Sequence, residues 1–146
     1  MEPKRILIID DEPSMTRMIR LTLEMTKRYQ VREENQAAHA LTTAREFKPD
    51  LILLDVIMPG VDGGELARRI KADPVFGQVP VIFLTGTVTK REAAEGAVTA
   101  GYPLLPKPVS LKILVETMEN AFAAKAHEKD KAAASTKEAN GELPKK

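Results

Sequence analysis

The sequence predicts an α/β fold in which five strand–helix units, written (βα)5, form a doubly wound parallel sheet. Segments with helical periodicity separate short aliphatic runs, and this alternation is typical of parallel sheets with helices on both faces. The runs are continuous, as in strands covered on both sides. The clearest are residues 5–9, 51–55 and 79–85.

Two further strands, near residues 29–34 and 104–106, are expected from weaker patterns. The first helix is expected over residues 14–27. Residues at helical spacing there form a stripe that would face the core, comprising Met15, Met18, Ile19, Thr22 and Met25.

The remaining helices are each expected to begin behind residues that cap helix N-termini. These are Asn35 before residues 37–47, Asp62 with Glu65 before 66–70, Thr89 with Glu92 before 93–100, and Ser110 before the last helix. The apolar face expected for that last helix comprises Leu111, Leu114, Val115, Met118 and Phe122.

Composition limits the classes of function. The chain has 146 residues, is 43% hydrophobic and carries a net charge of +1, so it lacks the basic excess of a nucleic-acid binder. It has no cysteine, which excludes disulfides, zinc thiolate sites and thiol nucleophiles. No signal peptide or membrane span is evident. We therefore expect a cytoplasmic protein that contacts neither nucleic acid nor membrane.

We expect one domain over residues 1–125 and a flexible charged tail over residues 126–146. Leu143 is the only large apolar residue of the tail, so the tail cannot bury enough surface to order itself. It is expected to be disordered or a frayed extension of the last helix. The chain is then either a stand-alone unit or a piece of a longer protein, and its charged end favours a natural terminus.

Polar side chains finish four of the five expected strands, whereas the second strand ends in nothing comparable. In an open parallel sheet, ligands bind beyond the carboxyl ends of the strands, where the strand order reverses. The polar residues are Asp10 and Asp11, Asp55, Thr85 and Lys107. Asp55 directly follows an aliphatic run, so we expect its carboxylate to emerge from a rigid strand.

Three carboxylates in one crevice repel one another, and a divalent cation relieves this repulsion. Mg²⁺ prefers oxygen ligands and usually takes one or two carboxylates. We expect Asp10 or Asp11, together with Asp55, to bind Mg²⁺, with the backbone carbonyl of Ile57 as a further ligand. The lysine and the threonine of the neighbouring strand ends would complete a cradle for a phosphoryl group, which a carboxylate oxygen attacks in line.

Each of these residues also has a structural explanation. The acids at 10–12 with Pro13 suit a helix start, and Asp55 suits a turn before Pro59. Thr85 suits a strand end, and Lys107 a solvated surface. Function is favoured because all of them fall at the same edge of the predicted sheet.

The strand ends carry four motifs that resemble the receiver domain of response regulators, the CheY-like phospho-accepting module of two-component signalling. Together they lie within residues 4–124, in the order ILIIDDEP (6–13), PDLILLDVIMPGVDG (49–63), PVIFLTG (80–86) and LLPKP (104–108). The resemblance implies a flavodoxin-like fold with strand order 2-1-3-4-5.

The resemblance also implies a role for each site residue. Asp55 is expected to be the phosphorylated aspartate, Asp10 and Asp11 the acidic pair that holds Mg²⁺, Thr85 the hydroxyl that contacts the phosphoryl group, and Lys107 the cation that pairs with it. The Lys107–Pro108 peptide bond is expected to be cis.

The expected partners follow from the same resemblance. A histidine kinase or histidine phosphotransfer protein is expected to donate the phosphoryl group, and the acyl phosphate is expected to draw Thr85 inward. This shifts a pre-existing equilibrium of the face formed by the fourth helix, the fifth strand and the fifth helix, which a downstream protein reads. The domain is expected to catalyse only its own phosphorylation and dephosphorylation, and so to act as a switch and not as an enzyme. It is expected to be a monomer or a weak homodimer.

Two features depart from the family pattern. Receivers usually carry Tyr or Phe three residues before the lysine, whereas this chain has Leu104 there and Tyr102 two residues further back, in a loop that is one residue shorter. Gly86 leaves the site open. Two alternatives therefore remain: a binding-only adaptor that does not turn over phosphate, and a metal-dependent phosphohydrolase. The second is disfavoured because Ile57 is apolar where such enzymes need an acid or base.

Overall fold

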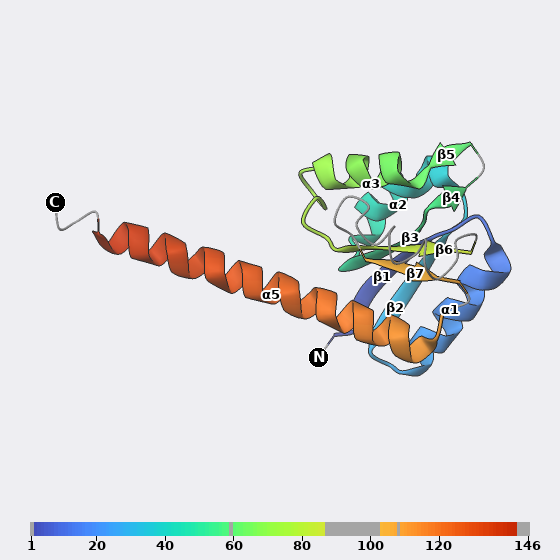
Figure 1. Cartoon of the computed structure of the whole chain (residues 1–146), viewed down its shortest axis with the longest axis horizontal. Coiled ribbons are helices and arrows are strands. Elements are labelled where there is room, and N and C mark those ends of the chain that lie inside the picture. The colour runs from blue at the N-terminus through green and yellow to red at the C-terminus, as the bar shows by residue number, and fades with distance from the viewer. Residues whose placement is uncertain (1, 59, 87–102, 108, 143–146) are drawn as a thin grey trace.

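The computed structural model describes residues 2–58, 60–86, 103–107 and 109–142. A five-stranded parallel sheet forms the middle layer, and helices cover both of its faces (Figure 1). Its strands are β1 (Lys4–Ile9), β2 (Tyr29–Glu34), β3 (Leu51–Asp55), β6 (Val81–Thr85) and β7 (Leu104–Pro106). Their order is β2-β1-β3-β6-β7, which confirms the predicted order 2-1-3-4-5.

The helices divide between the two faces (Figure 1). On one face lie α1 (Pro13–Met25) and α5 (Leu111–Glu142), and on the other lie α2 (Ala40–Phe47) and α3 (Gly63–Ala72). A short 3-10 helix, η1 (Ala37–His39), leads into α2. An unexpected hairpin of β4 (Ile57–Met58) and β5 (Val61–Asp62) precedes α3. The helix expected over residues 93–100 lies outside the described residues.

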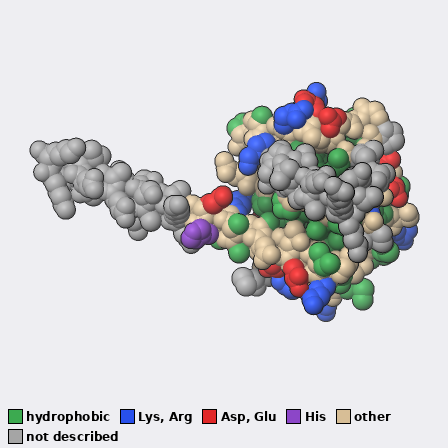
Figure 2. Space-filling model, viewed as in Figure 1, with side chains coloured by type: hydrophobic (Ala, Val, Ile, Leu, Met, Phe, Trp, Pro, Cys, Tyr) green, Lys and Arg blue, Asp and Glu red, His purple; other side chains and the backbone are tan. Residues whose placement is uncertain are grey.

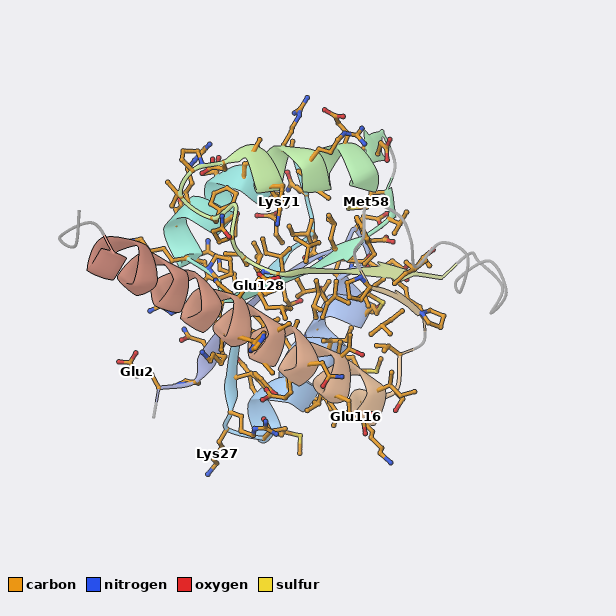
Figure 3. All side chains as sticks on the ribbon, turned by 60° about the vertical axis from the view of Figure 1, so that its left-hand side comes forward. Glu2, Lys27, Met58, Lys71, Glu116 and Glu128 are labelled. Carbon is orange, nitrogen blue, oxygen red and sulfur yellow. The ribbon has the colours of Figure 1, made fainter. Side chains whose placement is uncertain are left out.

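The central strands contribute to two hydrophobic cores, because successive side chains of a strand point to opposite faces. In β3, Ile52 and Leu54 pack in the core beneath α2 and α3, whereas Leu51 and Leu53 pack in the core beneath α1 and α5. Every residue of β3 is buried. Met58 of the hairpin packs into the first core beside α3 (Figure 3). Burial on both faces is the physical reason for the continuous aliphatic runs.

The buried face of α1 differs from the expected methionine stripe. Thr16, Ile19 and Leu23 are buried, whereas Met18 and Met25 are 58% and 80% exposed. A threonine can lie in this face because its hydroxyl donates a hydrogen bond to a glutamate of β2. The expected stripe is confirmed in part, because Ile19 is buried and Met15 packs against the core beneath α1 and α5. Apolar spacing alone adds two exposed methionines and misses the buried threonine.

The predicted caps are confirmed at α3 and α5 and wrong at α2. Asp62 accepts the N–H of Gly64, the second residue of α3, at 2.9 Å, and Ser110 accepts a backbone N–H of α5 at 3.4 Å. Glu65 pairs with an arginine one turn along α3 and does not close a capping box. At α2, the chain enters through η1, whose N-cap is Gln36, and Asn35 bonds elsewhere.

Helix α5 extends beyond the sheet and reaches Glu142 (Figure 1). Leu114 and Met118 on its first turns are buried against the sheet, as predicted. Of the two alternatives expected for the tail, the backbone up to Glu142 follows the helical one. The flexibility of this segment stays a prediction. Within the part of the chain that the structure describes, no helix combines the length and apolarity that crossing a membrane requires.

Charged residues of both signs lie side by side on the surface. Figure 2 shows them at the top of the visible face, over α3. Arg68 and Glu65 there form an ion pair of 2.6 Å. Solvent screens exposed pairs of this kind, so they contribute little to stability, and the fold depends mainly on its two cores.

Tyr29 connects β2 to α5. Its hydroxyl donates a hydrogen bond of 2.6 Å to Glu119, and burial, followed by this bond and the charge of Glu119, raises the pKa of Tyr29 from 10.0 to about 12. The folded state thus holds this proton more tightly than the unfolded state, so the stabilisation is complete below pH 10 and is lost as the pH rises toward about 12.

We predict that tyrosinate absorbance shows one ionisation step near pH 12 in the folded protein. Tyr29→Phe should remove this step, and the control Tyr102→Phe should leave it in place. Ionisation of Tyr29 at its ordinary pKa would contradict the contact with Glu119.

Candidate functional site

The carboxyl ends of the strands bring the expected residues to one edge of the sheet. Asp10 follows β1, Asp55 ends β3, Thr85 ends β6 and Lys107 follows β7. The strand register aligns these ends. Asp55 of β3 lies opposite Leu84 of β6, and the next residue of β6, Thr85, lies opposite Pro106 of β7. Because the strands run parallel, their polar ends lie at the same level.

The ammonium of Lys107 lies between buried carboxylates. Its Nζ is 2.6 Å from Asp10 Oδ2, 3.3 Å from Asp55 Oδ2 and 3.6 Å from Glu12 Oε1. The side chains of Lys107, Asp10 and Asp55 are 9%, 0% and 4% exposed, whereas that of Glu12 is 60% exposed. Salt screens charges at such depth only weakly, so Lys107 interacts strongly with Asp10 and Asp55.

The pKa of Lys107 lies above its ordinary value. Burial alone lowers this pKa, but the hydrogen bond and charge of Asp10, followed by those of Asp55, outweigh the effect of burial. Lys107 is therefore protonated at neutral pH. Its contribution to stability is present below the pKa of an unfolded lysine and is lost as the pH rises through the higher folded value.

Asp10 is fixed through both its backbone and its side chain. Its N–H donates to the carbonyl of Glu34 at 3.1 Å, and its own carbonyl accepts the Asn35 amide at 2.8 Å. Oδ1 accepts the N–H of Glu12 at 3.0 Å. Oδ2 is fully buried, and its contact of 2.6 Å with the ammonium of Lys107 is what offsets its charge.

The acidic residues fit a divalent cation. Asp10, Asp11 and Asp55 each offer one carboxylate oxygen, and these oxygens lie within 4.8 Å of one another. Asp11 is exposed and the other two are buried. Oxygen donors of this kind suit Mg²⁺, and one lysine does not neutralise three acids. The backbone of Ile57 lies in β4, close after Asp55, and its role as a ligand stays a prediction.

Thr85 and Gly86 border the lysine. Thr85 is buried, and its carbonyl accepts the N–H of Lys107 at 2.7 Å, which links the ends of β6 and β7. A Cβ at Gly86 would lie 3.5 Å from the Lys107 side chain. The glycine therefore leaves space beside the lysine, where a pocket of about 320 Å³ opens between α1 and Val109.

Two residues at this edge were not predicted as site residues. Glu12 contributes the third carboxylate near Lys107. Asn35 directly follows β2, the strand that was expected to end in nothing comparable, and it bonds to Asp10. Its position immediately after a strand was the available signal, but the sequence pattern suggested a helix cap.

Some expectations for this region fall outside the described residues. They are the cis Lys107–Pro108 bond and the position of Tyr102. Leu104, which stands where an aromatic residue was expected, lies in β7 opposite Phe83. It is half-buried and packs against the core beneath α2 and α3.

The response regulator receiver domain family matches residues 6–119. The chain belongs to this family. This confirms the resemblance seen in the four motifs and places the receiver domain in two-component signalling.

Relatives of this receiver domain differ in length. The phosphate regulon transcriptional regulatory protein PhoB of Pseudomonas aeruginosa is 40% identical over 117 residues, which cover 80% of this chain and 50% of PhoB. Protein PilH of the same organism is 32% identical over 120 residues, which cover 82% of this chain and 98% of PilH. The chain thus spans about half the length of PhoB and nearly all of PilH.

A solved structure supports the fold. The chemotaxis protein CheY4 of Vibrio cholerae superimposes on this receiver domain with a TM-score of 0.70 and 25% sequence identity. The match covers 82% of this chain and 98% of CheY4. The predicted flavodoxin-like fold is therefore confirmed.

Proposed function

We propose that this receiver domain accepts a phosphoryl group on Asp55 from a histidine kinase or a histidine phosphotransfer protein, with Mg²⁺, and signals through protein contacts. The observation that carries the proposal is the buried cluster at the sheet edge. Asp55 Oδ2 lies 3.3 Å from the ammonium of Lys107, and the carboxylate of Asp55 groups with those of Asp10 and Asp11.

In the proposed transfer, one carboxylate oxygen of Asp55 forms a bond to phosphorus. The P–N bond of the donor's phosphohistidine breaks, and the imidazole leaves with the bonding electron pair. Lys107 is protonated and close enough to neutralise oxygens of the transferred group. Asp10, Asp11 and Asp55 would hold Mg²⁺, which supplies positive charge to the same oxygens when it is bound. The hydroxyl of Thr85 would donate to the phosphoryl group after transfer.

The acyl phosphate would carry more negative charge than the free carboxylate, and it would compete with Asp10 for Lys107. The backbone N–H of Lys107 donates to the carbonyl of Thr85, which joins the ends of β6 and β7. We therefore expect the change to reach β7 and α5, the helix that follows it. A downstream protein would read the face of β7 and α5 together with the expected fourth helix, which lies outside the described residues. The domain's own chemistry would be limited to its phosphorylation and dephosphorylation. A cytoplasmic location and a monomeric or weakly dimeric state stay predictions.

The test is incubation with acetyl phosphate and Mg²⁺, followed by mass spectrometry of the intact protein. The wild type should gain one phosphoryl group, and Asp55→Asn or EDTA should abolish the gain. Asp50→Asn is the matched control, because Asp50 lies at the opposite end of the same strand, where it accepts the N–H of Arg5. It should be phosphorylated like the wild type.

The outcomes also separate the alternatives. A wild type that gains no mass from acetyl phosphate or from a phosphorylated kinase would contradict the proposal and favour the binding-only adaptor. Continuous release of phosphate from a small phosphomonoester would favour the phosphohydrolase.

A further inference from the structure

Asn35 contacts the site residue Asp10, although the proposed phosphoryl transfer gives Asn35 no role. It follows β2 and is half-buried. Its Nδ2 donates to the carbonyl of Asp10 at 2.8 Å and to Thr16 Oγ1 at 3.0 Å. An amide nitrogen has two hydrogens, so both are used. The carbonyl of Asp10 is only an acceptor, and this fixes which end of the amide faces it.

The second contact holds the amide in place. Thr16 is fully buried on α1, and its hydroxyl donates to Glu33 Oε1 at 2.6 Å. The other oxygen of Glu33 pairs with Arg20. The hydroxyl can donate its one proton to Glu33 at 2.6 Å or to the carbonyl of Pro13 at 3.1 Å, and in either case the oxygen of Thr16 can accept from Asn35. The amide is therefore held between α1 and the end of β2.

The carbonyl of Asp10 matters because it belongs to the peptide unit that joins Asp10 to Asp11. A peptide unit is planar, so fixing the direction of the carbonyl also fixes the N–H and the Cα of Asp11. The side chain of Asp10 has its own contacts with Glu12 and Lys107. The exposed side chain of Asp11 makes no hydrogen bond or ion pair with the described residues, so its position depends on its backbone.

We propose that Asn35 is a positioning residue for the cation site. It orients the Asp10–Asp11 peptide so that the carboxylate of Asp11 lies within reach of those of Asp10 and Asp55. The inference rests on the proposed Mg²⁺-dependent phosphorylation and adds to it a residue that touches neither the cation nor the phosphoryl group. Loss of the amide leaves the three acids in the chain but lowers their affinity for Mg²⁺.

The test is calorimetric titration of the unphosphorylated protein with Mg²⁺. Asn35→Ala should raise the dissociation constant on the order of 10-fold, as loss of a group that orients a metal ligand does. The Mg²⁺ concentration that gives half-maximal phosphorylation by acetyl phosphate should rise in parallel. The rate at saturating Mg²⁺ should stay close to that of the wild type, because Asp55 and Lys107 are unchanged.

Two further variants keep the result interpretable. Gln36→Ala alters the exposed neighbour of Asn35 and should bind Mg²⁺ like the wild type. Thr16→Val keeps the shape of Thr16 but removes the acceptor, so it should weaken Mg²⁺ binding less than Asn35→Ala does. Urea titrations in EDTA show whether each variant folds. If Asn35→Ala does not fold, Thr16→Val provides the test in its place. Unchanged Mg²⁺ affinity in a folded variant overturns the inference.

The inference and the proposed function can fail separately. A wild type that is phosphorylated, beside an Asn35→Ala variant with unchanged Mg²⁺ affinity, overturns the role of Asn35 alone. A wild type that binds Mg²⁺ but is never phosphorylated contradicts the proposed function, while the calorimetric comparison still tests Asn35.

Discussion

Lys107→Met should lower the free energy of unfolding by about 3 kcal/mol when divalent cations are absent, because loss of one partner leaves buried charges uncompensated. Nζ of Lys107 lies 2.6 Å from the fully buried Asp10 and 3.3 Å from Asp55. Methionine keeps much of the aliphatic stem and removes the charge, so the change reports mainly on the ion pairs. Urea unfolding at neutral pH in EDTA measures it.

Two comparisons identify the cause of this loss. Mg²⁺ should return part of the stability to Lys107→Met, since a bound cation takes over the compensation of charge and stabilises the folded state by mass action. The double variant Asp10→Asn/Lys107→Met should be more stable than the single one, because one buried carboxylate is gone. Lys112→Met, at an exposed lysine of α5, should stay within about 0.5 kcal/mol of the wild type. If Lys107→Met were equally mild, the lysine would not be buried between the acids.

The sheet could be predicted because burial on both faces constrains each central strand to an aliphatic composition. The face of α1 could not be predicted in the same way. Thr16 is buried because its hydroxyl meets Glu33 on β2, 17 residues away. Met18 and Met25 are exposed although they are apolar. Spacing along one helix does not show which partner a neighbouring strand supplies.

The residues of the site also fall into two groups: those that a position at a strand end predicts, and one whose partner is distant in the sequence. Asp10, Asp55, Thr85 and Lys107 could be predicted because parallel strands end at one edge, so a position at a strand end implies proximity. Asn35 has the local pattern of a helix cap. Its actual partner, the carbonyl of Asp10, is 25 residues away and becomes a neighbour only through the parallel pairing of β1 with β2.

Gly63→Ala should reduce both stability and phosphorylation, because there is no space for a methyl group at this position. A Cβ at Gly63 would lie 2.7 Å from the carbonyl oxygen of Val56 and 2.8 Å from that of Asp55. These are backbone atoms, so no side-chain rotation can relieve the contact. Overpacking of this kind costs about 2 kcal/mol, and we expect a loss of that size in urea unfolding.

The same clash should reach the acceptor residue. Either the first turn of α3 or the segment that leaves β3 must move, and the carbonyl of Asp55 belongs to that segment. Phosphorylation by acetyl phosphate should therefore slow in Gly63→Ala even at saturating Mg²⁺, in contrast to Asn35→Ala. Gly64→Ala is the matched control, since its Cβ would lie 3.3 Å from the side chain of Asp62 and alanine favours a helix. If both variants unfold at the same urea concentration, the close approach of α3 to the end of β3 is wrong. If Gly63→Ala is less stable but is phosphorylated at the wild-type rate, α3 yields to the methyl group while Asp55 keeps its place.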